Sequence, residues 1–287
     1  MGEGDFRSLN KILIIGLGLM GGSFAKALKD RGFDGKIYGM DLNERALDLA
    51  MELEIIDGHL APHSNNVRDI DLVVLATPIR KYKDVIEAMS QNLNSNVMVS
   101  DLGSVKNIYE DLKGVLPEGV RFIGGHPMAG SEKSGVENAD GNLFDGRCFF
   151  ITPYEDERGI KSLEKLIELT GAKVQRVCPK THDKMTALTS HLPHLSAAIL
   201  VDLLEDFNPN ASSKFVGKGF KDSTRIASGA PEVWKDIFVS NKEMVQTIEC
   251  FQKRLEDFKR AIELEDEAFL IEKLSRIKIS RDQMIEK

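Results

Sequence analysis

His126 is the side chain of this sequence best placed to act as an acid or a base. It follows two glycines at the end of a predicted strand and precedes a proline, so its backbone should be stiff and exposed. An imidazole there could take a proton from a substrate hydroxyl while the substrate loses a hydride, with a pKa not far from about 6.5. Ser104 ends the neighbouring predicted strand and could orient the imidazole or cap the following helix. The alternative is a loop histidine bonded only to backbone groups.

Two further histidines, His191 and His194, lie three residues apart on one predicted helical face beside Pro193. Two histidines at this spacing could bind a metal, but no third ligand is suggested nearby in the sequence, so we expect no metal site. Polar contacts to a substrate at a break in the helix are the preferred interpretation. Core or interface histidines are the alternative.

Lys221 and Arg225 could supply the positive charge that an anionic substrate would need. The chain has a formal net charge of −7, so such a substrate must meet a local positive cluster. The two residues are four apart and share one face of a helical turn. Arg225 could hold a carboxylate through two hydrogen bonds. A solvated pair of surface cations is the alternative.

A dinucleotide-binding turn is predicted near the N-terminus, where residues 11–23 read KILIIGLGLMGGS. A buried apolar strand is followed by glycines in G-x-G-x-x-G spacing and then by a helical pattern. Asp41 ends the second predicted strand twenty residues past Gly21, where a carboxylate would accept hydrogen bonds from a ribose. No arginine directly follows Asp41, which favours NAD over NADP. The residues expected at the cofactor are Gly16, Gly18, Leu19, Met20, Gly21 and Asp41; an ordinary βα turn is the alternative.

Three more residues are expected beside the cofactor because they follow other predicted strands. Thr77 and Pro78 come directly after the apolar run DLVVLA, and Gly103 comes after the strand that ends near Asp101. Ligands of open α/β sheets bind at the carboxyl ends of the strands. A simple strand-terminating turn is the alternative for each residue.

Strand and helix patterns alternate up to residue 178 and predict a Rossmann-type α/β domain with a doubly wound parallel sheet. The predicted strands cover residues 12–15, 36–40, 71–76, 97–100, 121–123, 148–151 and 173–177. The predicted helices between them include 44–53, 82–93, 106–115 and 159–170. We therefore expect one nucleotide-binding domain over residues 1–178.

From residue 179 the strand pattern disappears, and an all-α helical domain is expected over residues 179–287. One long helix is predicted over 182–205, with a kink at Pro193. Apolar residues then recur at alternating spacings of four and three from Met244 to Ile262, which makes a heptad seam. The seam could pack on helices of its own subunit. Its length favours pairing of two subunits, so we expect a homodimer.

Composition excludes several other classes of protein. The negative net charge argues against nucleic acid or an anionic membrane as the main partner. No apolar run approaches the roughly 20 residues that span a bilayer, and the first residues lack the pattern of a signal peptide. Three widely spaced cysteines suggest neither a metal cluster nor a disulfide framework. A soluble cytoplasmic protein is expected.

Five segments taken together resemble the prephenate dehydrogenase family. They are GLGLMGGS, DLGSVK at 101–106, GGHPMAGSEKSG at 124–135, SHLPH at 190–194 and GFKDSTRIA at 219–227. They occur in the family's order over nearly the whole chain. GGHPMAG and SHLPH are much more specific than the glycine fingerprint.

The resemblance implies oxidative decarboxylation of prephenate by NAD+ to 4-hydroxyphenylpyruvate, CO2 and NADH in tyrosine biosynthesis. It implies that His126 binds the C4 hydroxyl and takes its proton, supported by Ser104, and that Arg225 holds a carboxylate of the dianion. His194 and Lys221 would shape the pocket, with Glu132 at its entrance, and the helical domain would be dimeric. The expected catalytic residues are His126, Ser104 and His194; the expected substrate-binding residues are Arg225, Lys221, His191 and Glu132.

Three other functions remain open at this point. An arogenate dehydrogenase would share almost every motif. A non-catalytic NAD-binding regulator would need no base, so His126, Ser104 and Arg225 together argue against it. A β-hydroxyacid dehydrogenase would normally use a lysine base, which the GGHPMAG segment suits poorly. We also expect no fused chorismate mutase or regulatory domain, so any inhibition by tyrosine would act near the active site.

Overall fold

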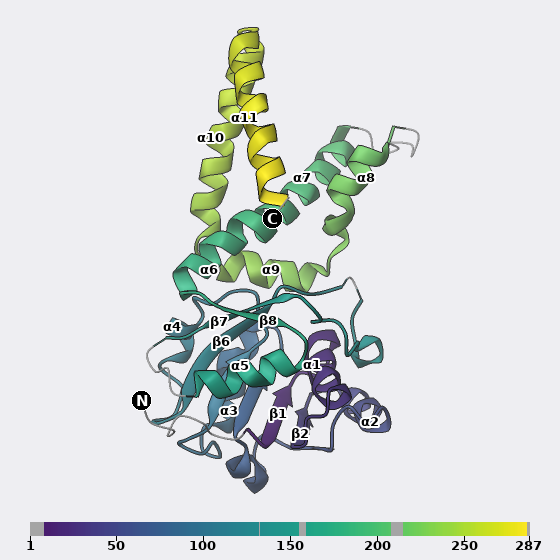
Figure 1. Cartoon of the computed structure of the whole chain (residues 1–287), viewed down its shortest axis with the longest axis vertical. Helices are drawn as coiled ribbons and strands as arrows, with labels where there is room; N and C mark the ends of the chain where they lie inside the picture. Colours follow the sequence, from purple (N-terminus) through teal and green to yellow (C-terminus); the bar gives the residue numbers. More distant parts are fainter. Residues whose placement is uncertain (1–8, 132, 155–158, 208–214, 286–287) are drawn as a thin grey trace. The chain divides into compact units, whose positions relative to one another are not determined.

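The computed structural model describes residues 9–131, 133–154, 159–207 and 215–285. The chain divides into two compact units, Met1–Lys242 and Glu243–Lys287. The first unit contains a sheet, the helices on both sides of it and four further helices. The second unit is a pair of long helices (Figure 1).

The sheet has the strand order β3-β2-β1-β4-β5-β6-β7-β8. The strands are β1 (Lys11–Ile15), β2 (Lys36–Met40), β3 (Gly58–His59), β4 (Leu72–Leu75), β5 (Met98–Asp101), β6 (Arg121–Pro127), β7 (Cys148–Thr152) and β8 (Lys173–Arg176). Strands β1 to β6 pair in parallel, whereas β7 runs antiparallel to β6 and β8 parallel to β7. The predicted doubly wound sheet is confirmed, with its last two strands reversed. The two-residue strand β3 was not predicted, because it is too short to leave a pattern.

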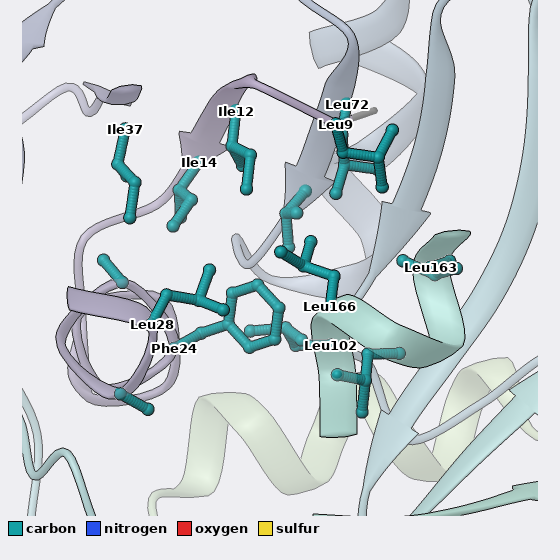
Figure 2. Packing of buried hydrophobic residues seen from close by; sticks show 14 of the residues in the cluster. Leu9, Ile12, Ile14, Phe24, Leu28, Ile37, Leu72, Leu102, Leu163 and Leu166 are labelled. Carbon is teal, nitrogen blue, oxygen red and sulfur yellow. The ribbon is translucent and has the colours of Figure 1, made fainter. Parts of the chain in front are cut away.

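Both faces of the sheet are buried, which explains the unbroken apolar runs in its strands. Ile12 and Ile14 of β1 lie in one core cluster, while Leu13 and Ile15 lie in the other. Figure 2 shows the first cluster, in which side chains of α1 (Leu19–Asp30) and α5 (Ile160–Leu169) pack below the β1 side chains. The second cluster packs against α3 (Tyr82–Met89), which contributes Tyr82 and Ile86.

The remaining elements of this α/β part are short. They are α2 (Glu44–Glu52), α4 (Tyr109–Leu112) and the 3₁₀ turns η2 (Asn65–Asp69), η3 (Ile79–Lys81) and η4 (Val136–Asn138). The helix predicted over 106–115 is reduced to α4. Its expected first turn is tied elsewhere, because the backbone N–H groups of Lys106 and Asn107 donate to the carboxylate of Asp183.

The all-α part begins with α6 (Pro179–Thr186), a π-helical turn η5 (Ala187–His191) and α7 (Leu192–Phe207). It continues through α8 (Lys218–Thr224), the 3₁₀ turn η6 (Arg225–Ser228) and α9 (Pro231–Ser240). The π turn comes directly before Pro193, which lacks the N–H needed to continue an ordinary helical ladder. The predicted disturbance of the long helix is therefore present, one turn ahead of the proline.

Pro179–Phe207 is the one helical stretch, among the described residues, long and apolar enough to cross a membrane. The sequence expectation missed it because only uninterrupted apolar runs were counted, whereas η5 joins α6 and α7. Such a match is weak evidence for a crossing, and His182 and Asp183 in its first turns are buried and hydrogen-bonded to the α/β part. Exposed Leu203 and Phe207 on α7 instead suit a contact with another subunit.

The second unit is a hairpin of α10 (Met244–Glu263) and α11 (Glu267–Ile285), and Phe258 packs edge-on against Phe269 between the two helices. The predicted seam thus lies on one continuous helix. Three of its members, Phe251, Leu255 and Ile262, are 42%, 61% and 64% exposed. These three side chains are therefore left largely uncovered by the described part of the chain, whereas Met244 is buried and Phe258 packs on α11.

Candidate active site

The glycine-rich turn between β1 and α1 leaves the start of α1 uncovered. Gly16 has φ +95°, and a Cβ there would lie 2.7 Å from the carbonyl of Ala76. A Cβ on Gly21 would collide with the Gly16 carbonyl oxygen. Among the described residues, no heavy atom beyond the adjoining chain lies within 4 Å of a Cβ built on Gly18, and Leu19 and Met20 begin the helix just beyond it. Free N–H groups at the positive end of a helix, beside open space, fit a pyrophosphate.

Asp41, at the end of β2, is fixed beside this turn. Its carboxylate oxygens accept hydrogen bonds from the backbone N–H groups of Leu17 (2.7 Å) and Asn43 (2.8 Å). A cavity next to it is lined by Leu17, Gly18, Asp41, Asn43, Arg45, Ala46, Leu49, Gly135, Val136 and Glu137. This lining suits the adenosine half of a dinucleotide, with Asp41 placed for ribose hydroxyls. Arg45 also lines the cavity, although it does not directly follow Asp41 in sequence.

Asp41→Ala should lower the preference for NAD over NADP by roughly tenfold or more, because it removes a carboxylate that would repel a 2′-phosphate and leaves Arg45 to attract one. The measurement is kcat/KM for each coenzyme at saturating second substrate. Asp48→Ala, which removes an exposed carboxylate from α2, is the matched control and should leave the ratio unchanged. An unaltered ratio in the Asp41 variant would show that the ribose is recognised elsewhere.

The other residues expected at the cofactor lie at the same edge of the sheet. Thr77 follows β4 directly, and its backbone N would be 2.8 Å from a Cβ on Gly16. The Thr77 hydroxyl is buried and has no hydrogen-bond partner in the described part of the chain, so it is available to a ligand. Pro78 is exposed at the start of η3. Gly103 follows β5, where its N–H donates to Asp101.

His126 lies within β6, and this corrects the prediction of an exposed loop after residue 123. Strand β6 continues to Pro127 because residues 124–127 pair antiparallel with β7. In this pairing His126 lies opposite Phe150. His126 is only 8% exposed. The two glycines before it are required by close packing, since a Cβ on Gly125 would lie 2.5 Å from the Asp101 carbonyl oxygen and one on Gly124 would collide with Thr152.

The partner of the His126 imidazole is His182 of α6. His126 Nδ1 lies 2.7 Å from His182 Nε2, and His182 Nδ1 lies 2.8 Å from Asp183 Oδ1. Ser104 is half-buried in the loop after β5, and among the described residues it forms no hydrogen bond to His126. It does not cap a helix either, because Asp183 takes the N–H groups of Lys106 and Asn107. Sequence reasoning missed His182 and Asp183.

The pKa of His126 is lowered well below its usual 6.5, chiefly because burial penalises the imidazolium and also because that cation would be repelled by Lys106 and by any positive charge on His182 or His191. The expectation of a pKa near 6.5 was therefore wrong. The sequence pattern placed this imidazole on an exposed loop, where none of these effects would act. A lowered pKa keeps His126 neutral, and so able to accept a proton, at physiological pH.

A fully buried ion pair fixes the backbone that carries His126. Lys106 Nζ lies 2.5 Å from Asp101 Oδ2 and also donates to the Gly125 carbonyl at 2.5 Å. Asp101 Oδ1 accepts the Gly125 N–H at 2.9 Å. The ion pair thus holds both the backbone N–H and the carbonyl of Gly125, the residue before His126. Lys106 and Asp101 are each about 1% exposed.

His191 and His194 have different surroundings although they are three residues apart. His191 is 1% exposed, and the Asn241 side chain donates to its Nδ1 at 3.0 Å. Burial lowers the pKa of His191 to about 4. Its burial and its bond to Asn241 favour the alternative that His191 is a core histidine rather than a direct substrate contact.

His194, in the first turn of α7, stacks on Trp234 with ring centroids 3.5 Å apart. Its Nδ1 is buried and has no hydrogen-bond partner among the described residues, and burial lowers its pKa. Gly229, at the end of η6, approaches the same ring, because a Cβ there would lie 3.1 Å from His194 Cε1. The segment that carries Arg225 is thus folded against α7 near His194.

Lys221 and Arg225 are both exposed, on α8 and at the start of η6. Neither has an ion-pair partner among the described residues, so both charges are available to an anion. Glu132 lies outside the described residues. No group of three or more His, Cys, Asp or Glu side chains that could hold a metal occurs in the described part of the chain.

Two family models match the chain in succession. Residues 24–176 match the nucleotide-binding domain of prephenate dehydrogenase, and residues 178–276 match its dimerisation domain. The chain belongs to the prephenate dehydrogenase family.

Individual relatives agree with this assignment. The chain is 33% identical to the prephenate dehydrogenase of Bacillus subtilis over 279 residues, which cover 94% of this chain and 75% of the relative. It is 31% identical to the cyclohexadienyl dehydrogenase of Zymomonas mobilis over 91% of each chain. A crystal structure of prephenate dehydrogenase from A. aeolicus, in complex with hydroxyphenyl propionate and NAD+, matches with a TM-score of 0.88 and 40% identity, covering 97% of this chain and 99% of that one.

The prephenate dehydrogenase domain models meet between residues 176 and 178, next to Cys178, which caps the start of α6. The compact units instead divide after Lys242, because α6 and α9 contact the α/β part while α7 and α8 pack with the elements next to them. The predicted boundary at 178/179 lies where the two family models meet, but it does not separate the two compact units. It therefore stays a prediction. In this member of the prephenate dehydrogenase family, the dimerisation-domain match begins on the helix that supplies the partner of His126.

Proposed function

We propose that this chain catalyses NAD-dependent oxidative decarboxylation of prephenate to 4-hydroxyphenylpyruvate, CO2 and NADH, in the cytoplasm, as a step of tyrosine biosynthesis. Membership of the family across both halves of the chain supports the substrate class. The similar A. aeolicus protein holds NAD+ together with hydroxyphenyl propionate, a phenol with a carboxylate side chain like the proposed product.

The observation that carries the proposal is the position and state of His126. Its imidazole lies at the carboxyl edge of the sheet, the edge where the glycine turn, Asp41 and Thr77 are found. Its Nδ1 is engaged by His182, so Nε2 is the nitrogen left for a substrate hydroxyl. A buried, neutral imidazole beside a dinucleotide site is what hydroxyl deprotonation during hydride loss requires.

The substrate itself supplies the driving force, since loss of hydride from C4 and of CO2 from C1 converts its ring into a phenol. Bound NAD+ would accept the hydride. Atoms and charge balance without net release of a proton, because the prephenate dianion and NAD+ give one product anion, CO2 and NADH. The proton that His126 holds during hydride loss therefore returns to the phenol oxygen.

The chain's other residues are assigned by the same proposal. Gly16, Gly18 and Gly21 admit the pyrophosphate, with Leu19, Met20, Thr77, Pro78 and Gly103 around the coenzyme. Ser104 borders the nicotinamide, and His194 presents its unpartnered Nδ1 to the substrate. Arg225 and Lys221 hold carboxylates, and Glu132 lies at the entrance. His191 supports this pocket from the interior.

Arg225→Ala should raise KM for prephenate by roughly tenfold to a hundredfold, since removing one partner of a charge-assisted pair costs about 2 kcal/mol or more. The KM for NAD should not change. Lys218→Ala, which removes another exposed cation from α8, is the matched control. An unchanged KM for prephenate in the Arg225 variant would exclude the carboxylate contact.

We further propose that the chain is a homodimer through its helical part. Residues 178–276 match a dimerisation domain. The exposed apolar side chains on α7 and on the α10–α11 hairpin, such as Leu203, Phe207, Leu255 and Ile271, need a cover of this kind. Sedimentation of the purified protein tests this, and a monomer at micromolar concentration would contradict it.

The function is tested by following NADH production from prephenate and from arogenate side by side. The proposal requires a higher kcat/KM with prephenate. The second candidate, arogenate dehydrogenase, is favoured by the similarity to the crystal structure of Synechocystis arogenate dehydrogenase (26% identity, TM-score 0.80), and it would show the reverse preference. Binding of NAD without turnover of either substrate would instead support a non-catalytic NAD-binding regulator.

A further inference from the structure

We propose that His182 and Asp183 are positioning residues that hold His126 in the one tautomer able to act as a base. The inference rests on the proposed function only where it says that His126 acts as a base. The tautomer of His126 is set by the hydrogen-bond chain, which forms without substrate. No motif singled out in the sequence contains either residue. They come from the first turn of α6, 56 residues beyond His126.

The chain of hydrogen bonds is continuous and buried. It runs from Asp183 Oδ1 to His182 Nδ1 (2.8 Å) and from His182 Nε2 to His126 Nδ1 (2.7 Å). His182 and Asp183 are 2% and 0% exposed, and the rings of Phe150 and His182 make a T-shaped contact with centroids 5.6 Å apart. Water therefore cannot replace either partner, and each imidazole nitrogen in the chain has one defined role.

The carboxylate of Asp183 determines the direction of every donor. It already accepts the backbone N–H groups of Lys106 (2.7 Å) and Asn107 (2.8 Å), so it acts only as an acceptor. His182 must then donate through Nδ1, which leaves its Nε2 as an acceptor. His126 must donate through Nδ1 in turn, and the lone pair of its Nε2 is left free.

The same arrangement stabilises the cation formed during the reaction. When His126 Nε2 takes the hydroxyl proton, the positive charge is shared through its Nδ1–H with His182 Nε2. The negative charge of Asp183 lies one imidazole further away. A carboxylate that orients a catalytic imidazole and stabilises its imidazolium is an established device, here acting through a second imidazole. The proton returns to the phenol oxygen, so no net proton leaves the chain.

The first experiment reads the tautomers in the unaltered protein with ¹⁵N-labelled histidine and long-range ¹H–¹⁵N correlation at mildly alkaline pH, without substrate. We expect both His126 and His182 to be protonated at Nδ1 and unprotonated at Nε2. Protonation of His126 at Nε2 would overturn the proposal. This result is independent of whether prephenate is the substrate.

The second experiment compares His182→Leu with His182→Gln in steady-state turnover. The leucine variant should lose roughly 10²-fold in kcat, with little change in KM, because His126 loses the acceptor that fixes its tautomer. The glutamine side chain offers an amide oxygen near the position of Nε2, which can accept the His126 Nδ1–H in its place. The kcat of the glutamine variant should therefore be at least about tenfold higher than that of the leucine variant. Equal kcat in the two variants, or wild-type kcat in the leucine variant, contradicts the proposal.

Lys184→Gln on the same turn of α6 is the matched control, because Lys184 is exposed, and it should keep wild-type kcat. If the unaltered protein turns over neither prephenate nor arogenate, the proposed function fails while the tautomer experiment still decides the positioning role. If it turns over prephenate but His126 carries its proton on Nε2, only the positioning role fails.

Discussion

His126→Asn should lower kcat for prephenate by roughly 10²-fold or more while the affinity for NAD stays unchanged, since the variant loses the base but not the coenzyme site. The asparagine amide can still donate to His182 Nε2 from near the position of Nδ1, so the buried hydrogen-bond chain keeps its donor. The loss should therefore appear in kcat rather than in stability. The measurements are steady-state turnover and NAD titration.

His63→Asn is the control for this substitution, because His63 is exposed and remote in sequence from every predicted motif. Its turnover should equal that of the unaltered protein. Near-normal kcat in the His126 variant would remove the base assignment and, with it, the proposed mechanism.

The pH dependence of kcat gives an independent check. Protonated His126 cannot accept a proton, so kcat falls as the pH drops through the pKa of His126 and is constant above it. Because burial and neighbouring positive groups lower that pKa well below 6.5, kcat at pH 6.5 should still be close to its plateau. A half-maximal kcat at or above pH 6.5 would contradict this.

Lys106→Met should lower the free energy of unfolding by about 3–5 kcal/mol, because it leaves the Asp101 carboxylate buried without its countercharge. Lys106 and Asp101 are each about 1% exposed, and burial lowers the pKa of Lys106 while Asp101 opposes that shift. The loss should be largely recovered in the double variant Asp101→Asn/Lys106→Met, since neither of the two positions then carries a charge. Urea denaturation of the variants measures both effects.

Lys83→Ala is the matched control, because it breaks an exposed ion pair with Glu87 at 3.8 Å on α3. Its cost should be no more than about 0.5 kcal/mol, as is usual for exposed i,i+4 pairs. A similar small cost for Lys106→Met would mean that the buried pair does not hold β6 in place.

The patterns that predicted this fold are local ones. Strand β2 was predicted at its observed bounds, Lys36–Met40, because its largely apolar run leaves a local signal in the sequence. The helix over 106–115 was predicted too long, because its first turn is tied to Asp183, which is more than seventy residues away. Strand β6 was predicted too short, because residues 124–127 pair only with β7, which no local pattern could assign.

The candidate site divides in the same way. The glycine turn, Asp41 and His126 were found from the sequence, since each follows a predicted strand and such ends meet at one edge of a parallel sheet. His182 and Asp183 were missed, although a histidine and an aspartate side by side in a first helical turn were a visible signal. Their contact with His126 depends on the packing of α6 against the end of β6, which the sequence does not reveal.

The sequence by itself determined the α/β architecture, and it was enough to predict the dinucleotide site and the proposed base, His126, because glycine spacing and apolar periodicity act over a few residues. Only the tertiary structure decided the state of that base. Burial, the ion pair of Lys106 with Asp101 and the hydrogen bond to His182 all arise from contacts between distant segments. Protonation and tautomer follow from such three-dimensional surroundings, and residue order alone does not specify them.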